Sequence, residues 1–304
     1  MASMMAPETV IAGVELGGTK CIATLARGKD ILRQQRWATE GPETLDRVSA
    51  TLAGWQDEVP FEAIGIGSFG PLCLDPGNAH FGRIENTPKP GWAGADVHGH
   101  FARRFALPVG IDTDVGGAAL AEGQWGAAMG CAVHGYATIG TGVGLGLVVD
   151  GKAVHGRLHP EAGHMRIRRM PGDMFEGACP AHGDCLEGLI GGPALAARAN
   201  GALADMPDDD PLWDRVAREL GEWVAMLILC VSPQRLVIGG GVLDYRPTLL
   251  AKIRVAVAAN LGGYLAGLDL AALETLIVPP ALGRDAGPLG AIIVGQNALR
   301  GSQA

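Results

Sequence analysis

Apolar side chains recur at helical spacing in three parts of this sequence. They fall every three or four residues at Leu45, Val48 and Leu52, again across residues 97–105, and in a long run over residues 212–231. This spacing places the apolar positions on one face of a helix. The pattern therefore predicts three amphipathic helices.

Short apolar runs that end in glycine lie between these helices, and residues 63–71 and 235–241 are two of them. Strands that alternate with amphipathic helices indicate an α/β architecture. Ligands of such folds bind at the carboxyl ends of the strands, which is where these glycines gather.

One strand-turn-strand unit occurs twice. A strand runs into Gly17 and its partner ends at Gly28, and the same arrangement recurs 123 residues later at Gly140 and Gly151. A fixed offset between two matching units indicates a duplicated lobe. We expect the two loops to face each other across a cleft.

Glycine loops of this kind suit phosphate, because backbone N–H groups can point at phosphoryl oxygens where no Cβ intervenes. Thr19, Lys20 and Thr141 add side-chain donors. Either loop alone is better explained by an ordinary β-hairpin. The pairing favours phosphate binding.

Composition narrows the classes of protein. A chain of 304 residues favours two domains. The net charge of −8 argues against a nucleic-acid partner, which selects a basic surface. No apolar run is long enough to span a membrane, and the first residues lack the features of a secretory signal, so we expect a cytoplasmic protein.

A cluster of soft ligands predicts a metal site. Cys179, His182 and Cys185 are evenly spaced, and His164, which follows a glycine, is the best fourth ligand. Two thiolates and two imidazoles suit tetrahedral zinc, and a site with four protein ligands is structural. His155 and His159 remain alternative ligands.

The metal would hold an irregular segment in place. Residues 155–185 show no helix or strand periodicity and need a cross-link to hold their shape.

Cys230, in an apolar helical stretch, is expected to be a small buried residue.

Two acidic residues are candidates for phosphoryl transfer. Asp114 follows an apolar strand and precedes a helix, so it fits an N-cap, and in a phosphate-binding cleft it also fits a base that accepts the proton of an attacking hydroxyl. Glu15 stands just before the first glycine loop and fits either an ordinary polar strand end or a ligand for the hydration shell of Mg²⁺.

Other polar residues suit a polyol. Asn86 stands near Trp92 in a proline-rich loop, Glu161 lies near the proposed ligand His164, and Glu187 follows Cys185 closely. Carboxylates and amides bind vicinal hydroxyls well, although each of these residues alone is more often a solvated loop residue.

Six ordered motifs resemble the ROK family (repressor, open reading frame, kinase), and most closely its bacterial fructokinase branch. They are residues 15–20 (ELGGTK), 65–71 (GIGSFGP), 86–92 (NTPKPGW), 112–115 (DTDV), 159–164 (HPEAGH) and 179–187 (CPAHGDCLE). The resemblance covers residues 12–298.

The resemblance implies a fold and an assembly. The fold is α/β, actin-like and ribonuclease-H-like, with two lobes that close on ATP and a hexose, usually in a homodimer. The N-terminal lobe would comprise residues 11–116 with a C-terminal helix at about 288–302 packed on it. The C-terminal lobe would comprise residues 117–287 and contain the zinc insert at about 155–188.

The resemblance also implies roles for individual residues. Asp114 matches the catalytic base, and the sugar-side positions are Asn86, Glu161, His164 and Glu187. The zinc ligands are His164, Cys179, His182 and Cys185. On the nucleotide side, the matching residues are Gly17, Gly18, Thr19 and Lys20 in the first loop, Thr141 and Gly142 in the second, and Pro193, Gly239, Gly240 and Gly241 near the adenosine.

Two positions depart from the family pattern. Gly116 replaces an Asn that usually stands two residues after the catalytic aspartate, which removes an amide and weakens the first helical turn. Ala162 replaces a usual Met, which removes packing volume near the sugar loop.

We therefore expect an ATP-dependent kinase that converts D-fructose to fructose 6-phosphate, with ATP, Mg²⁺ and structural Zn²⁺. Alternatives are a family kinase for glucose, mannose or an N-acetylhexosamine, a sugar-responsive transcriptional repressor, and a non-catalytic sugar-binding protein. Repressors of this family carry an N-terminal helix-turn-helix, whereas only about ten residues precede the first predicted strand here.

Overall fold

The computed structural model describes residues 9–201 and 203–303, and the chain divides into two compact units. The first unit combines the residues up to Ala121 with Ala153–His159 and with the residues from Arg284 onward. The second comprises Glu122–Lys152 and Pro160–Gly283. The chain is of the expected α/β class.

The unit boundaries differ from the expected ones at the start of the insert. Residues 153–159 belong to the first unit instead of the second. The reason is local bonding, because His155 contacts Asp112 and His159 accepts a hydrogen bond from the backbone of Leu72.

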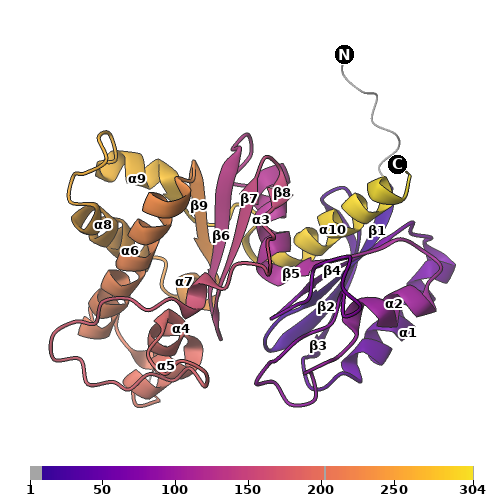
Figure 1. The fold of residues 1–304 in the computed structure, drawn as a ribbon, viewed down its shortest axis with the longest axis horizontal. Helices are drawn as coiled ribbons and strands as arrows, with labels where there is room; N and C mark the ends of the chain where they lie inside the picture. Colours follow the sequence, from indigo (N-terminus) through magenta and orange to yellow (C-terminus); the bar gives the residue numbers. More distant parts are fainter. Residues whose placement is uncertain (1–8, 202, 304) are drawn as a thin grey trace. The chain divides into compact units, whose positions relative to one another are not determined.

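Five strands form the sheet of the first unit, in the spatial order β3-β2-β1-β4-β5. β1, β4 and β5 are parallel, whereas β2 is antiparallel to both of its neighbours. The helices α1 and α2 cover one face and α10 the other (Figure 1). The elements are β1 (Val10–Leu16), β2 (Lys20–Arg27), β3 (Asp30–Ala38), α1 (Thr44–Glu58), β4 (Ile64–Ser68), α2 (Val97–Arg104), β5 (Val109–Thr113), the start of α3 (Asp114–Trp125), and α10 (Ala286–Ser302).

Helix α10 approaches its sheet closely because three neighbouring strands present glycine to it. Gly13, Gly65 and Gly110 stand side by side on β1, β4 and β5. A Cβ atom at Gly65 would lie 1.9 Å from the carbonyl oxygen of Ala291 in α10, so only glycine fits. A helix from the C-terminal part of the sequence thus buries one face of an N-terminal sheet.

The second unit is built around a sheet with the order β10-β9-β6-β7-β8 and a core that includes α4, α6, α8 and α9. Its elements are β6 (Val133–Ile139), β7 (Val143–Val149), β8 (Lys152–Ala153), the 3-10 turn η1 (Ala162–His164), α4 (Leu186–Ile190), α5 (Gly192–Arg198), η2 (Leu203–Asp205), α6 (Pro211–Val231), β9 (Arg235–Gly239), α7 (Gly241–Tyr245), α8 (Leu249–Leu261), α9 (Leu270–Leu276) and β10 (Ile277–Val278). A third turn, η3 (Gly283–Asp285), leads into α10.

The two sheets repeat one design. Read from β8, the second sheet has the strand order of the first read from β3. β1 and β6 keep the offset of 123 residues, and buried and exposed positions follow each other identically along both strands. The duplication predicted from the glycine loops is confirmed.

Helix α6 confirms the helix that was predicted from the long apolar run. The side chain of Asp210 caps it by accepting a hydrogen bond from the backbone N–H of Leu212 at 2.8 Å.

Cys230 is exposed, so the expectation of a buried thiol is wrong. The core contacts of α6 end at Ile228, two residues earlier. No helix among residues 9–201 and 203–303 is both long and apolar enough to cross a membrane.

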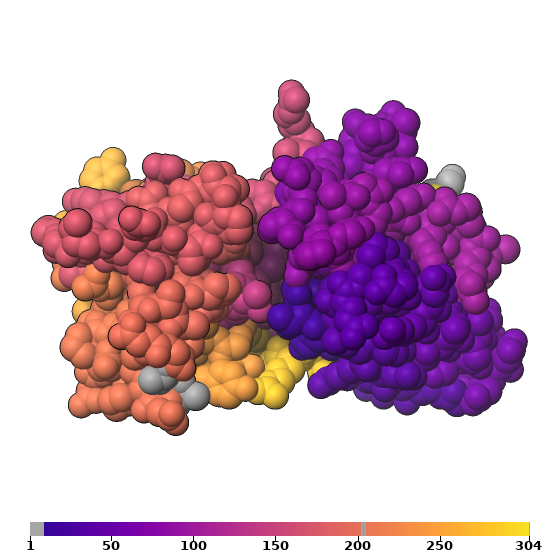
Figure 2. Space-filling model, turned by 90° about the horizontal axis from the view of Figure 1, so that it is seen from below, coloured from indigo at the N-terminus to yellow at the C-terminus, as the bar shows by residue number. Residues whose placement is uncertain are grey.

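Residues 165–185 contain no helix, as their lack of periodicity predicted, and their rose-coloured surface lies on the second unit in Figure 2. A buried group of charges holds this segment. Asp173 lies 3.0 Å from both Arg169 and Arg198, and Arg198 lies 2.9 Å from Glu219 of α6. The segment therefore has a staple of ion pairs that the sequence analysis did not foresee.

Candidate functional site

Candidate residues of the first unit lie at the ends of parallel strands of one sheet. Glu15 lies near the end of β1, before the glycine loop that begins at Gly17, and Asp114 follows β5 directly. Between them, Gly67 of β4 is close enough that an added Cβ would lie 3.4 Å from the Cα of Asp114. The structure thus brings the two predicted carboxylates and the first glycine loop together.

The N-cap of α3 is Thr113 and not Asp114. The Oγ1 atom of Thr113 accepts a hydrogen bond from the backbone N–H of Gly116 at 2.9 Å, which is the bond that an N-cap side chain makes. Asp114 is the first helical residue, and its Oδ1 accepts from the N–H of Val115. The capping interpretation of Asp114 is therefore wrong.

Burial raises the pKa of Asp114 to about 6. The hydrogen bond from Val115 and the positive charge of Lys89 lower this pKa, while the charge of Asp112 raises it. A carboxyl group with this pKa is mostly ionised at pH 7 and still binds a proton well enough to act as a general base.

Burial also raises the pKa of Glu15, to about 7, against the lowering effect of Lys20. Its Oε2 atom is buried and has no hydrogen-bond partner among the described residues. A buried carboxylate oxygen without a partner fits a water molecule from the shell of a hydrated Mg²⁺ ion.

Replacing Glu15 with Gln is expected to stabilise the metal-free protein at pH 8 and to change it little at pH 5. The folded-state pKa lies above the ordinary value of 4.5, so the wild type loses stability as the pH rises from about 4.5 to about 7. The gain at pH 8 is on the order of 1–3 kcal/mol. Denaturant midpoints of Glu15→Gln and of the exposed control Glu62→Gln measure it, and an equal change at both pH values would contradict the burial effect.

Four side chains of the second unit form the predicted ligand cluster. The donor atoms of His164, Cys179, His182 and Cys185 all lie within 4.8 Å of one another. The Sγ atom of Cys179 is 3.7 Å from Nδ1 of His164 and 3.6 Å from Nδ1 of His182, and Sγ of Cys185 is 3.5 Å from Nδ1 of His164. Tetrahedral Zn²⁺, with bonds of about 2.0–2.3 Å, holds its ligands about 3.3–3.8 Å apart. The cluster therefore fits zinc.

A tight backbone turn places His164 in this cluster. A Cβ atom at Gly163 would lie 1.9 Å from the carbonyl oxygen of Val143, so the predicted close approach is confirmed. The indole of the fully buried Trp223 donates a hydrogen bond to the carbonyl of Ala162 at 3.0 Å. The turn is thus fixed on both sides.

The alternative ligands His155 and His159 are bonded elsewhere. His155 Nε2 lies 3.1 Å from Oδ1 of Asp112, and His159 Nε2 accepts from the N–H of Leu72 at 3.0 Å. Neither side chain contributes to the converging cluster. The prediction that they replace His164 is therefore wrong.

The predicted nucleotide residues of the second unit gather around the second glycine loop. The N–H of Gly192 donates to the carbonyl of Gly140 at 2.8 Å, and β9 ends beside β6, where Gly239 pairs with Thr138. The carboxylate of Glu187, predicted on the sugar side, accepts from the N–H of Val143 at 3.0 Å. The residues gathered here are Thr141, Gly142, Glu187, Pro193, Gly239, Gly240 and Gly241.

The remaining predicted residues are more exposed. Thr19, Lys20 and Asn86 have exposed side chains, and Asn86 lines a cavity of about 410 Å³ in the first unit. Glu161 Oε2 lies 3.9 Å from Nε2 of His164. The ring nitrogen of His164 that is turned away from the cysteines is therefore beside a carboxylate.

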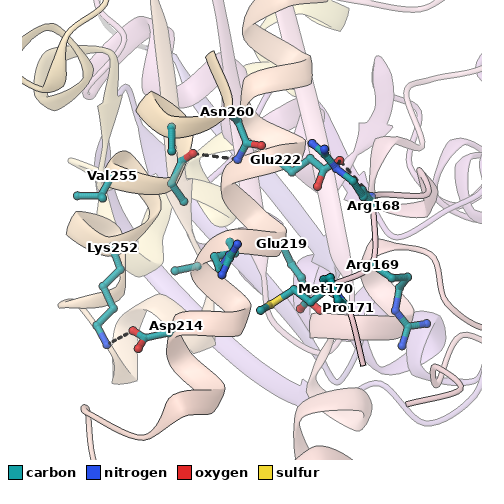
Figure 3. Close-up of a pocket in the computed structure, with 14 residues that line it drawn as sticks. Arg168, Arg169, Met170, Pro171, Asp214, Glu219, Glu222, Lys252, Val255 and Asn260 are labelled. Carbon is teal, nitrogen blue, oxygen red and sulfur yellow. Dashed lines mark hydrogen bonds and ion pairs between the residues drawn. The ribbon is translucent and has the colours of Figure 1, made fainter. Parts of the chain in front are cut away.

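A larger cavity of about 760 Å³ lies in the second unit, lined by α6, α8 and residues 168–171 (Figure 3). It contains none of the predicted site residues. Figure 3 shows two ion pairs among its charged side chains, with Lys252 2.7 Å from Asp214 and Arg168 3.6 Å from Glu222. We therefore do not assign the active site to this cavity.

The sequence model of the ROK family matches residues 11–298. The chain belongs to the ROK family. It is 42% identical over 290 residues to the fructokinase of Zymomonas mobilis, covering 91% of this chain and 93% of that one. It is 38% identical over 293 residues to the fructokinase of Pediococcus pentosaceus, covering 96% and 99%. The structure of a ROK family glucokinase from Streptomyces griseus in complex with glucose and AMPPNP matches with a TM-score of 0.75 at 25% identity, covering 95% and 99%.

The two departures from the ROK pattern have local explanations. A Cβ atom at Gly116 would lie 2.4 Å from Oδ1 of Asp112, so a side chain here would displace the carboxylate that contacts His155. At Ala162 the backbone is held by Trp223, so the missing Met side chain does not leave the loop unsupported.

Three features near the candidate site were not predicted from the sequence. They are the Thr113 cap, the contact between Asp112 and His155, and the position of Lys89 close to the first glycine loop. Lys89 did carry a signal, because it stands between two prolines in a motif that was otherwise considered for its amide and its tryptophan.

Proposed function

We propose that this chain is an ATP-dependent kinase that phosphorylates D-fructose on its 6-hydroxyl and yields fructose 6-phosphate. Two fructokinases are similar to it over more than nine-tenths of its length, and a related glucokinase binds glucose and AMPPNP. The geometric observation that carries the proposal is Asp114, a partly exposed carboxylate with a pKa of about 6 at the end of a parallel strand near a glycine loop.

Asp114 acts as the base. As the 6-hydroxyl oxygen bonds to the γ-phosphorus, the bond from that phosphorus to the bridging oxygen of ADP breaks, and the hydroxyl proton passes to the carboxylate of Asp114. Because its pKa is about 6, Asp114 then releases the proton to solvent near neutral pH.

Backbone N–H groups of the two glycine loops bind the nucleotide phosphates. Glu15 would hold the hydration shell of Mg²⁺, which neutralises phosphate charge when bound. The residues assigned to ATP are Gly17, Gly18, Thr19, Lys20, Thr141, Gly142, Pro193, Gly239, Gly240 and Gly241.

The hexose hydroxyls are assigned to Asn86, Glu161, His164 and Glu187. His164 directs Nδ1 to the cysteines, and its Nε2, beside Glu161, is the nitrogen that remains for a hydroxyl. Glu187 also holds the N–H of Val143, so one carboxylate connects the sugar residues to the second glycine loop.

His164, Cys179, His182 and Cys185 hold zinc in a closed structural site. With four protein ligands the ion has no free position for water, and it contributes folding energy in place of chemistry. His164 would be fixed as a ligand of bound zinc, and Cys185 would fix the start of the helix that carries Glu187.

The proposed setting follows from the family. We propose a homodimer in the cytoplasm, with a hexose and ATP as its small-molecule partners. Size-exclusion chromatography with light scattering measures the oligomeric state.

A coupled assay of ADP release tests the function. With fructose, glucose, mannose, N-acetylmannosamine and N-acetylglucosamine at equal concentration, fructose is expected to give the highest kcat/KM, by about tenfold or more, because pocket contacts discriminate between sugars in the transition state. A higher kcat/KM for another sugar would show that fructose is not the preferred substrate. Binding of fructose without ADP release would indicate a non-catalytic sugar-binding protein, and binding of DNA would indicate a repressor.

A further inference from the structure

Lys89 lies in the loop that follows β4, and its ammonium group reaches the first glycine loop. Its Nζ donates a hydrogen bond to the backbone carbonyl of Gly18 and lies 4.9 Å from the centre of the Phe69 ring. The loop is anchored nearby by Trp92, which is fully buried and packs edge-on against Phe69. The ammonium group is thus held at a defined place.

The positive charge of the Lys89 ammonium group is only partly balanced by neighbouring groups. No carboxylate among the described residues lies within ion-pair distance of Lys89, and its hydrogen-bond partner is an uncharged carbonyl. Burial lowers the pKa of Lys89, and the negative charge of Asp114 acts against that effect. A partly buried ammonium without a carboxylate partner is a place where an anionic ligand gains the most from binding.

We propose that Lys89 is a catalytic residue whose ammonium group binds the γ-phosphoryl group of ATP while that group moves to the hexose. The inference rests on the proposed kinase function and adds a residue to it. Lys89 contacts the loop assigned to the phosphates and is electrostatically coupled to the base, so the phosphorus in transit is expected within its reach.

Lys89 takes no part in the exchange of bonds. The hexose oxygen gains the phosphoryl group, ADP leaves with the bridging oxygen, and the hydroxyl proton goes to Asp114. Lys89 stays protonated and stabilises the charge on the phosphoryl oxygens.

A purely structural role is the competing explanation, since Lys89 could simply fasten its loop to Gly18 and Phe69. Lys89→Met separates the two roles, because Met keeps an unbranched apolar stem on Phe69 and removes the charge. Lys89→Arg keeps the charge. Lys29→Met, at an exposed turn of the same unit, is the matched control.

Lys89→Met is expected to lower kcat by about 10²–10³-fold while KM for the hexose changes by less than about threefold. Lys89→Arg recovers part of the loss, and Lys29→Met behaves as wild type. Affinity for ADP with aluminium fluoride, which mimics the phosphoryl group in transit, falls about as much as kcat, whereas affinity for ADP alone does not. Thermal midpoints of all variants stay within about 3 °C of wild type.

The pH profile adds a readout that a structural role would not move. The charges that act on Asp114 are those of Lys89, Asp112 and Glu15, and Glu15 in turn is influenced by Lys20, Arg36 and Asp285. Removing the charge of Lys89 raises the pKa of Asp114, so the acidic limb of kcat/KM moves to higher pH.

The outcomes separate this inference from the function on which it rests. If the wild type phosphorylates a hexose and Lys89→Met keeps kcat and aluminium-fluoride affinity within about threefold, the role of Lys89 is overturned and the kinase stands. A loss of kcat with unchanged aluminium-fluoride affinity and an unmoved acidic limb also overturns it. If the wild type phosphorylates no sugar, both fail.

Discussion

Replacing Asp114 with Asn is expected to lower kcat for hexose phosphorylation by about 10³-fold, which is the range for loss of a general base. Asn cannot take the proton of the 6-hydroxyl at any useful rate. It can still accept the hydrogen bond that Asp114 receives from the N–H of Val115, and the Thr113 cap of α3 is untouched. The variant is therefore expected to fold and to bind nucleotide like the wild type.

Three measurements check this result. Steady-state assays give kcat, calorimetric titration with AMPPNP gives the nucleotide affinity, and thermal unfolding gives the stability. Asp209→Asn, at an exposed turn of the second unit, is the matched control for the chemical change. Turnover of Asp114→Asn within about tenfold of wild type would remove Asp114 from its assigned role.

Removing zinc is expected to lower the thermal midpoint of the protein by about 10 °C or more, because structural zinc contributes many kcal/mol to folding. The cluster is the only group of converging metal-type ligands among residues 9–201 and 203–303, and residues 165–185, which carry three of the ligands, contain no helix. Activity is expected to fall with stability, since the helix that carries Glu187 begins directly after Cys185 and Glu187 holds the second glycine loop.

Elemental analysis is expected to find about one zinc ion per chain in the purified protein. Chelation and Cys179→Ser should give the same loss of midpoint, and added zinc should reverse the first but not the second. Cys230→Ser, at an exposed position outside the cluster, is the control. If the purified protein contains no zinc and its thermal midpoint changes with neither treatment, zinc is not needed for stability. The ion pair of Asp173 and Arg198 would then be sufficient to hold the segment.

Local patterns in the sequence predicted most of the architecture. The offset between the glycine loops reflects two sheets with one strand order, and the apolar spacing from Leu212 onward marks the longest helix of the second unit. Both features depend on neighbours along the chain, which periodicity reports directly. The soft ligands were also foreseeable, since three of the four fall within seven residues.

Contacts between distant residues were not predictable in this way. The ion pairs of Arg198 with Asp173 and Glu219 join three separate segments, and nothing in the order of residues shows that they meet. The cap of α3 was misplaced by one residue because Thr113 and Asp114 both have cap-forming side chains and only backbone geometry separates them. Lys89 was missed because its hydrogen-bond partner, Gly18, lies on another loop, 71 residues away along the chain.

The glycine row beneath α10 has a consequence for how the protein is made. A ribosome completes β1, β4 and β5 early, yet the sheet face bearing Gly13, Gly65 and Gly110 stays uncovered until α10 has been synthesised. The second unit lies wholly between those strands and that helix along the chain, so it can fold during synthesis, ahead of the first. The unit that carries Asp114 is therefore begun before the second unit and completed after it. Nascent chains that stop short of α10 leave the apolar face of the first sheet uncovered and prone to aggregation.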